Sequence, residues 1–301
     1  MIDAILSWSN LCRAWEKVAD NRGSPGLDRV SITRFARHWE ENLHRLQELV
    51  RSRTYRSGGL RRVAIPKRSG GQRLLSIPNI GDRVLQRAAL NVLEMQLDRR
   101  FLSCSYGYRP RRGLRQAVGA ILQLRDAGQR WVLDADIDDC FDSLDHALLS
   151  ELVRKVVDDN RVVSLIEQWM TVGRRQRHPD RGIAQGMPIS PLLCNLYLHE
   201  MDWVLVRSRW KLVRYADDFI ICCATRTQAE QALEATAAVL ATLKLRLEPR
   251  KTQVTSFNAG FTFLGVEFQG DHYTFTWEDK RIAVTGKAPA WLWSYAPPGY
   301  E

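Results

Sequence analysis

The amino-acid sequence predicts an α+β fold, and the order of its periodic segments is the main reason. Helical periodicity dominates the first 60 residues and returns over 80–101 and 113–127. Short apolar runs typical of strands come mostly later, at 131–137 and 211–223. Because strands and helices do not alternate regularly along the chain, the pattern indicates an α+β arrangement rather than repeated βαβ units.

A predicted hairpin interrupts the helical N-terminal part. Two short segments with apolar residues, 62–67 and 73–77, flank a glycine-containing turn at 69–71, and basic residues crowd the tip of this hairpin. Such runs around a turn are typical of two paired strands. An earlier loop is expected at Asn21–Gly26, where glycine and proline break the helical pattern.

The part of the chain after residue 130 combines strands and helices. Lys211–Cys223 is typical of a strand, a tight turn and a second strand. Thr227, followed three residues later by Glu230, is a capping-box pattern that predicts a helix to about Leu243. Other expected elements are a strand over 131–137, helices carrying Leu148–Val157, over 160–171 and after Pro188, and strands near 252–256 and 261–268.

The composition favours a polyanionic partner and argues against a membrane segment. The formal net charge is +10 and the sequence pI is about 9.6, values that suit nucleic acid. There is no uninterrupted apolar run of eighteen residues and no secretory signal pattern in the sequence. The six cysteines are scattered, as expected for reduced thiols, so we expect a cytoplasmic protein without a membrane partner.

Arginines and aromatic residues cluster in two stretches that could form a nucleic-acid surface. Arginine side chains bind phosphates, and aromatic rings stack on bases or sugars. A solvated basic face is the alternative interpretation. The clustered residues are Arg51, Arg53, Tyr55, Arg56, Arg61, Arg62, Lys67, Arg68 and Arg73 in the first stretch, and Tyr106, Tyr108, Arg109, Arg111, Arg112 and Arg115 in the second.

Two groups of acidic residues carry the strongest chemical signal. Asp134, Asp136 and Asp138 alternate along a predicted strand, and Asp217 and Asp218 lie at the tip of an apolar hairpin. Burying adjacent carboxylates is unfavourable without compensating charge, and Mg²⁺ binds carboxylate and phosphate oxygens together. A solvated turn explains the second group nearly as well, because aspartate favours turns. It does not explain the acidic strand some eighty residues upstream.

The sequence resembles prokaryotic reverse transcriptases of the group II intron-like class over about residues 15–268. The shared order of the matching segments argues against coincidence. These segments are Asn21–Asp28, Arg62–Pro78, Asp82–Ala88, Ser105–Pro110, Asp134–His146, Ala184–Pro191, Tyr215–Asp218, Leu247–Thr252 and Phe263–Gly265.

This resemblance implies a right-hand polymerase fold with fingers and palm, and a thumb that is short or absent. Residues 1–130 would form the fingers with an N-terminal extension and the beginning of the palm. Residues 131–270 would form the palm with the catalytic motifs, and 271–301 a short C-terminal tail that could dock a partner. The implied activity is RNA-directed DNA polymerisation, in which two Mg²⁺ ions, or Mn²⁺, assist nucleotidyl transfer.

The resemblance also implies the catalytic residues. Asp136, Asp217 and Asp218 would be catalytic metal ligands, and Ile137 would belong to the same metal-binding set. Asp134 and Asp138 are rival ligands, because alternate residues share one face of a strand. Relatives usually have a small or basic pair where this chain has Asp138 and Asp139. Asp142 is expected to cap the helix that follows it.

Further residues are implied in substrate binding. Phe141 would lie beneath the incoming sugar and exclude a 2′-hydroxyl group, or else be a core aromatic. The other implied nucleotide-binding residues are Lys67, Arg73, Gln185, Gly186 and Lys251, and the implied primer or template contacts are Arg109, Tyr215, Phe263, Leu264 and Gly265. The substrates would be an RNA template, a DNA or RNA primer and deoxynucleoside triphosphates.

The biological role has several interpretations. The segments Asp134–Ile137, Asp158–Val163 and Phe257–Phe261 are most similar to the branch of CRISPR-associated reverse transcriptases. This resemblance implies spacer acquisition from RNA and a CRISPR integrase complex as protein partner. A retron or other defence-associated reverse transcriptase is the second interpretation. A non-catalytic RNA-binding palm and an RNA-dependent RNA polymerase are the remaining ones. The complete set of acids argues against the former, and Phe141 argues against the latter.

Overall fold

The computed structural model describes residues 1–66, 72–173, 179–277 and 280–286. The chain forms two compact units, each built from two separate stretches. The first unit contains residues 1–100 and 141–196, and the second contains 101–140 and 197–301. This division does not test the predicted boundaries of fingers and palm, which stay predictions.

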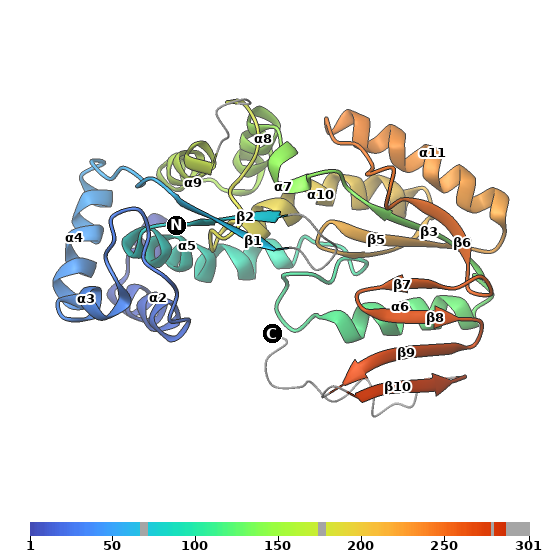
Figure 1. Cartoon of the computed structure of the whole chain (residues 1–301). Coiled ribbons are helices and arrows are strands. Elements are labelled where there is room, and N and C mark those ends of the chain that lie inside the picture. The colour runs from blue at the N-terminus through green and yellow to red at the C-terminus, as the bar shows by residue number, and fades with distance from the viewer. Residues whose placement is uncertain (67–71, 174–178, 278–279, 287–301) are drawn as a thin grey trace. The chain divides into compact units, whose positions relative to one another are not determined.

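The first unit is mainly helical, with α5 at its centre (Figure 1). Val84, Leu85, Ala88 and Ala89 on α5 are fully buried, and α5 packs against α1, α2 and α4. The helices and strands are α1 (Ile2–Ile5), α2 (Trp8–Asp20), α3 (Ile32–Ala36), α4 (Trp39–Arg51), β1 (Arg61–Pro66), β2 (Gln72–Ile77), α5 (Ile80–Asp98), α7 (Cys140–Ser143), α8 (His146–Val156), α9 (Asn160–Gly173) and the start of α10 (Ser190–Arg207).

The predicted N-terminal hairpin is confirmed. Strands β1 and β2 pair antiparallel from Arg61 opposite Ile77 to Pro66 opposite Gln72. The expected turn between them falls on residues outside the described ranges, as does the implied nucleotide-binding residue Lys67.

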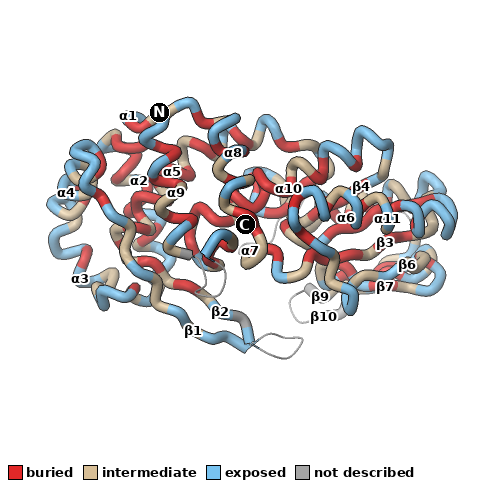
Figure 2. Tube along the Cα trace, turned by 90° about the horizontal axis from the view of Figure 1, so that it is seen from above, coloured by how far each residue is buried: buried red, intermediate tan, exposed pale blue. Residues whose placement is uncertain are grey.

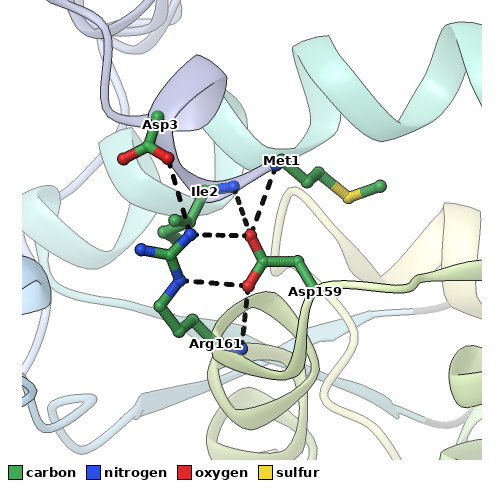
Figure 3. Close-up of polar contacts among 5 residues, drawn as sticks. All are labelled: Met1, Ile2, Asp3, Asp159 and Arg161. Atoms are coloured by element: carbon green, nitrogen blue, oxygen red, sulfur yellow. Dashed lines mark hydrogen bonds and ion pairs between the residues drawn. The ribbon is translucent and has the colours of Figure 1, made fainter.

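The beginning of α9 is joined to the N-terminus through Asp159 (Figure 3). The Asp159 carboxylate accepts hydrogen bonds from the backbone N–H of Arg161 at 3.1 Å and of Ile2 at 2.9 Å. It also forms ion pairs with the Met1 ammonium and the Arg161 guanidinium, 3.3 and 3.1 Å away. Asp159 therefore caps α9 and holds α1 at the same point.

Replacing Asp159 by alanine is expected to lower the free energy of unfolding by about 1–2 kcal/mol at pH 7, because the helix cap is lost together with the contact to α1. Urea denaturation of the parent and the variant measures this difference. Asp3→Ala is the matched control, since Asp3 contacts the same Arg161 at 3.5 Å but is largely exposed. Its effect should stay within about 0.5 kcal/mol.

The effect of Asp159 should also depend on pH. The hydrogen bond from Arg161, followed by those from Ile2 and the N-terminus, holds the pKa of the Asp159 carboxyl well below its usual range. A lowered pKa in the folded state adds stability above the unfolded pKa of about 4, and this stability is lost as pH falls toward the folded pKa. The difference between parent and D159A should thus shrink below about pH 4. A constant difference would contradict this assignment.

The second unit contains two antiparallel sheets, and helix α6 shares an apolar cluster with both of them. The first sheet has the strand order β4-β5-β3-β6, and the second has the order β10-β9-β8-β7. The elements are α6 (Leu114–Asp126), β3 (Trp131–Asp136), β4 (Lys211–Tyr215), β5 (Asp218–Cys223), α11 (Arg226–Thr242), β6 (Gln253–Ser256), β7 (Phe261–Phe263), β8 (Val266–Gln269), β9 (His272–Trp277) and β10 (Lys280–Thr285).

Burial on both faces of the first sheet explains the apolar sequence of its central strands (Figure 2). Helix α11 packs against β3, β5 and β6, and α6 packs against β4 and β5. On the side of α6, Ile121 joins Val132 and Ile220 of the first sheet and Phe268 of the second in one apolar cluster. The sheet that carries the acidic residues is therefore supported by packing on both sides.

The structure corrects three predicted local features. Thr225, and not Thr227, caps α11 by accepting a hydrogen bond from the N–H of Gln228. Asp145, and not Asp142, caps α8 through the N–H of Leu148. The single strand expected over 261–268 consists of β7 and β8, joined by a turn at Leu264 and Gly265 with φ of +52° and +76°.

The stretch after residue 270, for which the sequence predicts only a short C-terminal tail, contains two strands in its described part. Strands β9 and β10 pair antiparallel, and β9 also pairs with β8. Residues 287–301 lie outside the described ranges, so the proposed docking role of the tail is not tested. Within the described ranges, no helix combines the length and the apolar character that a bilayer crossing requires.

Candidate active site

Strand pairing in the second unit places the two acidic groups side by side. Asp136, at the end of β3, is the register partner of Asp218, at the beginning of β5. Tyr215 pairs with Asp218 across β4 and β5, so Ala216 and Asp217 form a two-residue turn. Residues about eighty positions apart are thus brought to one edge of the sheet, as the acidic patterns predicted.

The electrostatics of this edge show a local excess of negative charge. The pKa of Asp218 is raised to about 7, first by desolvation of its carboxyl group and then by the charges of Asp136 and Asp217. The residue as a whole is nevertheless exposed. Lys251 forms an ion pair with Asp136, and this contact raises the pKa of the lysine ammonium. The ammonium partly compensates a site that carries three neighbouring carboxyl groups.

The segment 246–251 is fixed to the end of β3 by backbone hydrogen bonds. The N–H of Asp138 donates to the Arg246 carbonyl at 3.0 Å, and the N–H of Glu248 donates to the Asp136 carbonyl at 2.9 Å. This arrangement brings Lys251 to the acidic edge. The implied lysine motif and the first palm motif therefore meet in the structure.

The rival ligands Asp134 and Asp138 have other partners. Asp134 accepts a hydrogen bond from the side chain of Gln253 at 3.1 Å. Asp138 pairs with Arg246, whose guanidinium nitrogens lie 2.6 and 2.7 Å from one carboxylate oxygen. Arg246 therefore offsets the negative charge of Asp138, at a position where related reverse transcriptases usually have a small or basic residue. Asp136 differs from Asp134 in being the register partner of Asp218, whereas Asp134 lies opposite Ile220.

The donor chemistry of the acidic edge fits a divalent cation. Three neighbouring carboxyl groups supply the hard oxygen ligands that Mg²⁺ prefers, and the raised pKa of Asp218 marks charge that a cation would relieve. Ile137 could contribute only its main-chain carbonyl, because its side chain is apolar and buried. In the part of the chain that the structure describes, no group of three or more His, Cys, Asp or Glu is already arranged to hold a metal ion.

The first unit holds the other implied nucleotide-binding residues. The main chain of Gln185 accepts a hydrogen bond from the N–H of Ser76 at 2.8 Å, which joins the glutamine–glycine motif to β2. Gly186 has φ of +106°, and a Cβ there would lie 2.4 Å from the Ser76 carbonyl oxygen. Phe141 is 8% exposed, which also fits a core aromatic. The side chain of Arg73 lies outside the described part.

The implied primer and template residues have mainly structural contacts here. Arg109 is buried and donates hydrogen bonds to the carbonyls of Leu102 and Ser105, at 2.6 and 2.9 Å. Phe263 belongs to the apolar cluster around α6, and Tyr215 packs against that cluster. Their predicted contacts with nucleic acid stay predictions.

Sequence reasoning missed a buried ion pair beneath the acidic turn. Arg214 on β4 and Asp202 on α10 are both fully buried, and their nearest charged atoms are 2.5 Å apart. The available signal was a single arginine within an apolar strand and a single aspartate on an apolar helix, each of which requires a partner of opposite charge.

Comparison with known proteins identifies the family. Residues 65–268, more than half of the chain, match the family described as reverse transcriptase (RNA-dependent DNA polymerase). The chain belongs to this family. Members share the right-hand polymerase fold, so the fold predicted from the resemblance is confirmed.

Individual relatives agree with this assignment. Protein YkfC of Escherichia coli K12 is 34% identical over 80% of this chain and 75% of its own length. The group II intron-encoded protein LtrA of Lactococcus lactis is 32% identical over 60% of this chain. The present chain spans only 31% of LtrA. The likeness to LtrA confirms the group II intron-like class.

A solved structure described as a partial Cas6-RT-Cas1–Cas2 complex also aligns with this chain. The identity is 26%, and the alignment covers 80% of this chain and 41% of that chain. The TM-score is 0.48, and the CRISPR role stays a prediction.

Proposed function

We propose that this reverse transcriptase extends a primer on an RNA template by two-metal nucleotidyl transfer, with Asp136, Asp217 and Asp218 as the metal ligands. The main supporting observation is the pairing of Asp136, at the end of β3, with Asp218, at the beginning of β5, beside the two-residue turn that holds Asp217. The raised pKa of Asp218 and the ion pair between Lys251 and Asp136 add electrostatic support.

The acidic residues would hold Mg²⁺, or Mn²⁺, between the primer end and the triphosphate. Bound divalent cations would activate the primer 3′-hydroxyl group and neutralise charge on the departing pyrophosphate. Lys251 is largely exposed and can turn from Asp136 toward the triphosphate. Its ammonium could there donate a proton to pyrophosphate. Lys67 and Arg73 would bind the triphosphate oxygens.

Primer extension by the purified chain tests this proposal. A labelled DNA primer on an RNA template should be extended with deoxynucleotides and Mg²⁺, and EDTA should stop the reaction. A chain that binds the template–primer but adds no nucleotide would contradict the proposal and favour a non-catalytic RNA-binding palm.

Phe141→Ala is expected to weaken discrimination against ribonucleotides by about tenfold or more, because the smaller side chain would leave room for the 2′-hydroxyl group. The measurement is the ratio of kcat/KM values for a deoxynucleotide and the matching ribonucleotide. Phe35→Ala is the control, since Phe35 is similarly buried in the first unit but lies on α3. Equal ratios in F141A and the parent would contradict the sugar-selecting role.

We propose spacer acquisition from RNA in a CRISPR system as the biological role. Its support is the sequence similarity noted at Asp134–Ile137, Asp158–Val163 and Phe257–Phe261. Co-expression with a Cas1–Cas2-type integrase should give a complex that survives gel filtration. Separate elution of the two components would leave a retron or other defence role as the better interpretation.

A further inference from the structure

A buried ion pair lies directly beneath the turn that carries Asp217. The guanidinium of Arg214 donates to both carboxylate oxygens of Asp202, from Nε at 2.7 Å and from a terminal nitrogen at 2.5 Å. Both side chains are 0% exposed. This two-bond geometry fixes the orientation of the guanidinium plane and thus aims its remaining nitrogen.

That remaining nitrogen holds the backbone of the acidic turn. It donates a hydrogen bond of 2.8 Å to the main-chain carbonyl of Ala216. Ala216 is the first residue of the two-residue turn and has φ of +59°. Residues with a Cβ rarely adopt this left-handed conformation, and they keep it where the surroundings enforce it. The bond from Arg214 is one such constraint.

The backbone of Arg214 is fixed as firmly as its side chain. Its N–H donates to the Cys104 carbonyl at 2.8 Å, and its carbonyl accepts from the N–H of Tyr106 at 2.8 Å. Gly107 then lies so close to the turn that a Cβ there would be 2.4 Å from the Ala216 nitrogen. The arginine therefore has a fixed position from which it can transmit order to the turn.

We propose that Arg214 and Asp202 are positioning residues for the metal-binding acids. Asp202 orients the guanidinium of Arg214, and Arg214 holds Ala216 in its left-handed conformation. The conformation of Ala216 in turn sets the direction in which the side chains of Asp217 and Asp218 project from the turn. The inference rests on the proposed function, because it assigns a role within the same catalytic site.

A purely structural ion pair would behave differently from a positioning pair. Replacing a buried pair by apolar residues of similar total volume often leaves a protein folded, whereas removing one partner leaves an uncompensated buried charge. The double variant R214M/D202L should thus fold, yet lose the hydrogen bond to Ala216. Loss of activity in a folded chain would separate positioning from stability.

R214K is the second variant. Lysine keeps the positive charge next to Asp202, but a single ammonium cannot reproduce the fork that contacts both Asp202 and the Ala216 carbonyl. The matched control is R130A/D271A, which removes an exposed ion pair of 2.8 Å in the same unit, outside the acidic edge.

The measurement is a pre-steady-state burst of single-nucleotide addition, combined with Mn²⁺ binding by electron paramagnetic resonance. For both variants the burst rate should fall about 10- to 100-fold, as expected when reacting groups are displaced by about an ångström. Mn²⁺ affinity should fall as well, while KM for the nucleotide stays within about threefold of the parent. The control should match the parent. The burst amplitude measures the fraction of active chains. A purely structural role would lower this amplitude and leave the burst rate unchanged.

A burst rate within twofold of the parent in R214K, or in a folded R214M/D202L chain, would overturn the positioning role. If the double variant does not fold, R214K decides the question. An R214K chain that lacks a cooperative melting transition would also count against a role confined to the turn. A parent chain without any primer extension would instead refute the proposed function.

Discussion

Asp217→Asn is expected to lower the rate of primer extension by at least about 10³-fold. The amide cannot supply the negative charge that a divalent cation needs at this position. The turn itself should persist, because asparagine adopts turn conformations as readily as aspartate. Single-turnover extension measures the loss, and fluorescence anisotropy should show template–primer affinity within about threefold of the parent.

Asp138→Asn provides a sharp comparison for D217N. Asp138 is a rival ligand two residues after the end of β3, but in the structure it pairs with Arg246. Its replacement should reduce the extension rate by less than about tenfold, since an ion pair with an exposed arginine contributes little. Full extension by D217N, or a larger loss in D138N than in D217N, would contradict the metal assignment.

The second large effect is expected from Gly107→Ala. A Cβ at residue 107 would lie 2.4 Å from the Ala216 nitrogen and 3.0 Å from the Tyr215 carbonyl carbon. Both atoms belong to the backbone, so no side-chain rotation can relieve the collision. The turn that holds Asp217 must shift, and displacement of reacting groups by about an ångström lowers rates about 100-fold.

The same burst assay measures the effect of G107A. Gly113→Ala is the control, because a Cβ at Gly113 would approach nothing closer than the Gln116 side chain at 3.6 Å. G113A should extend primers at the parent rate. A G107A chain with an unchanged burst rate would show that the turn tolerates the displacement, and that its backbone geometry is less important than we infer.

The sequence was sufficient to predict the elements that carry the acids. The apolar run over 131–137, and the apolar runs on both sides of Asp217, correspond to β3, β4 and β5 within about a residue. The pattern works here because both faces of the sheet are buried, so each strand has a continuous apolar signal. Their antiparallel pairing then brings Asp136 to Asp218.

The exact cap of one helix and the division of one strand could not be predicted in the same way. The cap of α11 is Thr225 instead of Thr227, because two threonines near a helix start give the same local signal. The turn at Leu264 and Gly265 divides one apolar run into two strands, a division that apolar content alone does not show.

The partners of the buried charged side chains also could not be predicted from local sequence patterns. Arg109 was assigned to the nucleic-acid surface because it lies in a basic stretch, yet its guanidinium donates hydrogen bonds to the carbonyls of Leu102 and Ser105. The pairing of Arg214 with Asp202 joins a strand to a helix and depends on packing between them. Charge and spacing indicate that such residues need partners, but not which partners they have.

The central claim is that Asp136, Asp217 and Asp218 hold divalent cations together. Electron paramagnetic resonance of Mn²⁺ tests it directly, on a complex of the chain with RNA template, dideoxy-terminated primer and the next deoxynucleotide. The complex with the parent chain should bind two more Mn²⁺ ions than the same nucleic acid and nucleotide bind without protein. The D136N, D217N and D218N substitutions should each lower the affinity for these two ions about tenfold or more. Equal Mn²⁺ binding by the parent and all three variants would contradict the account.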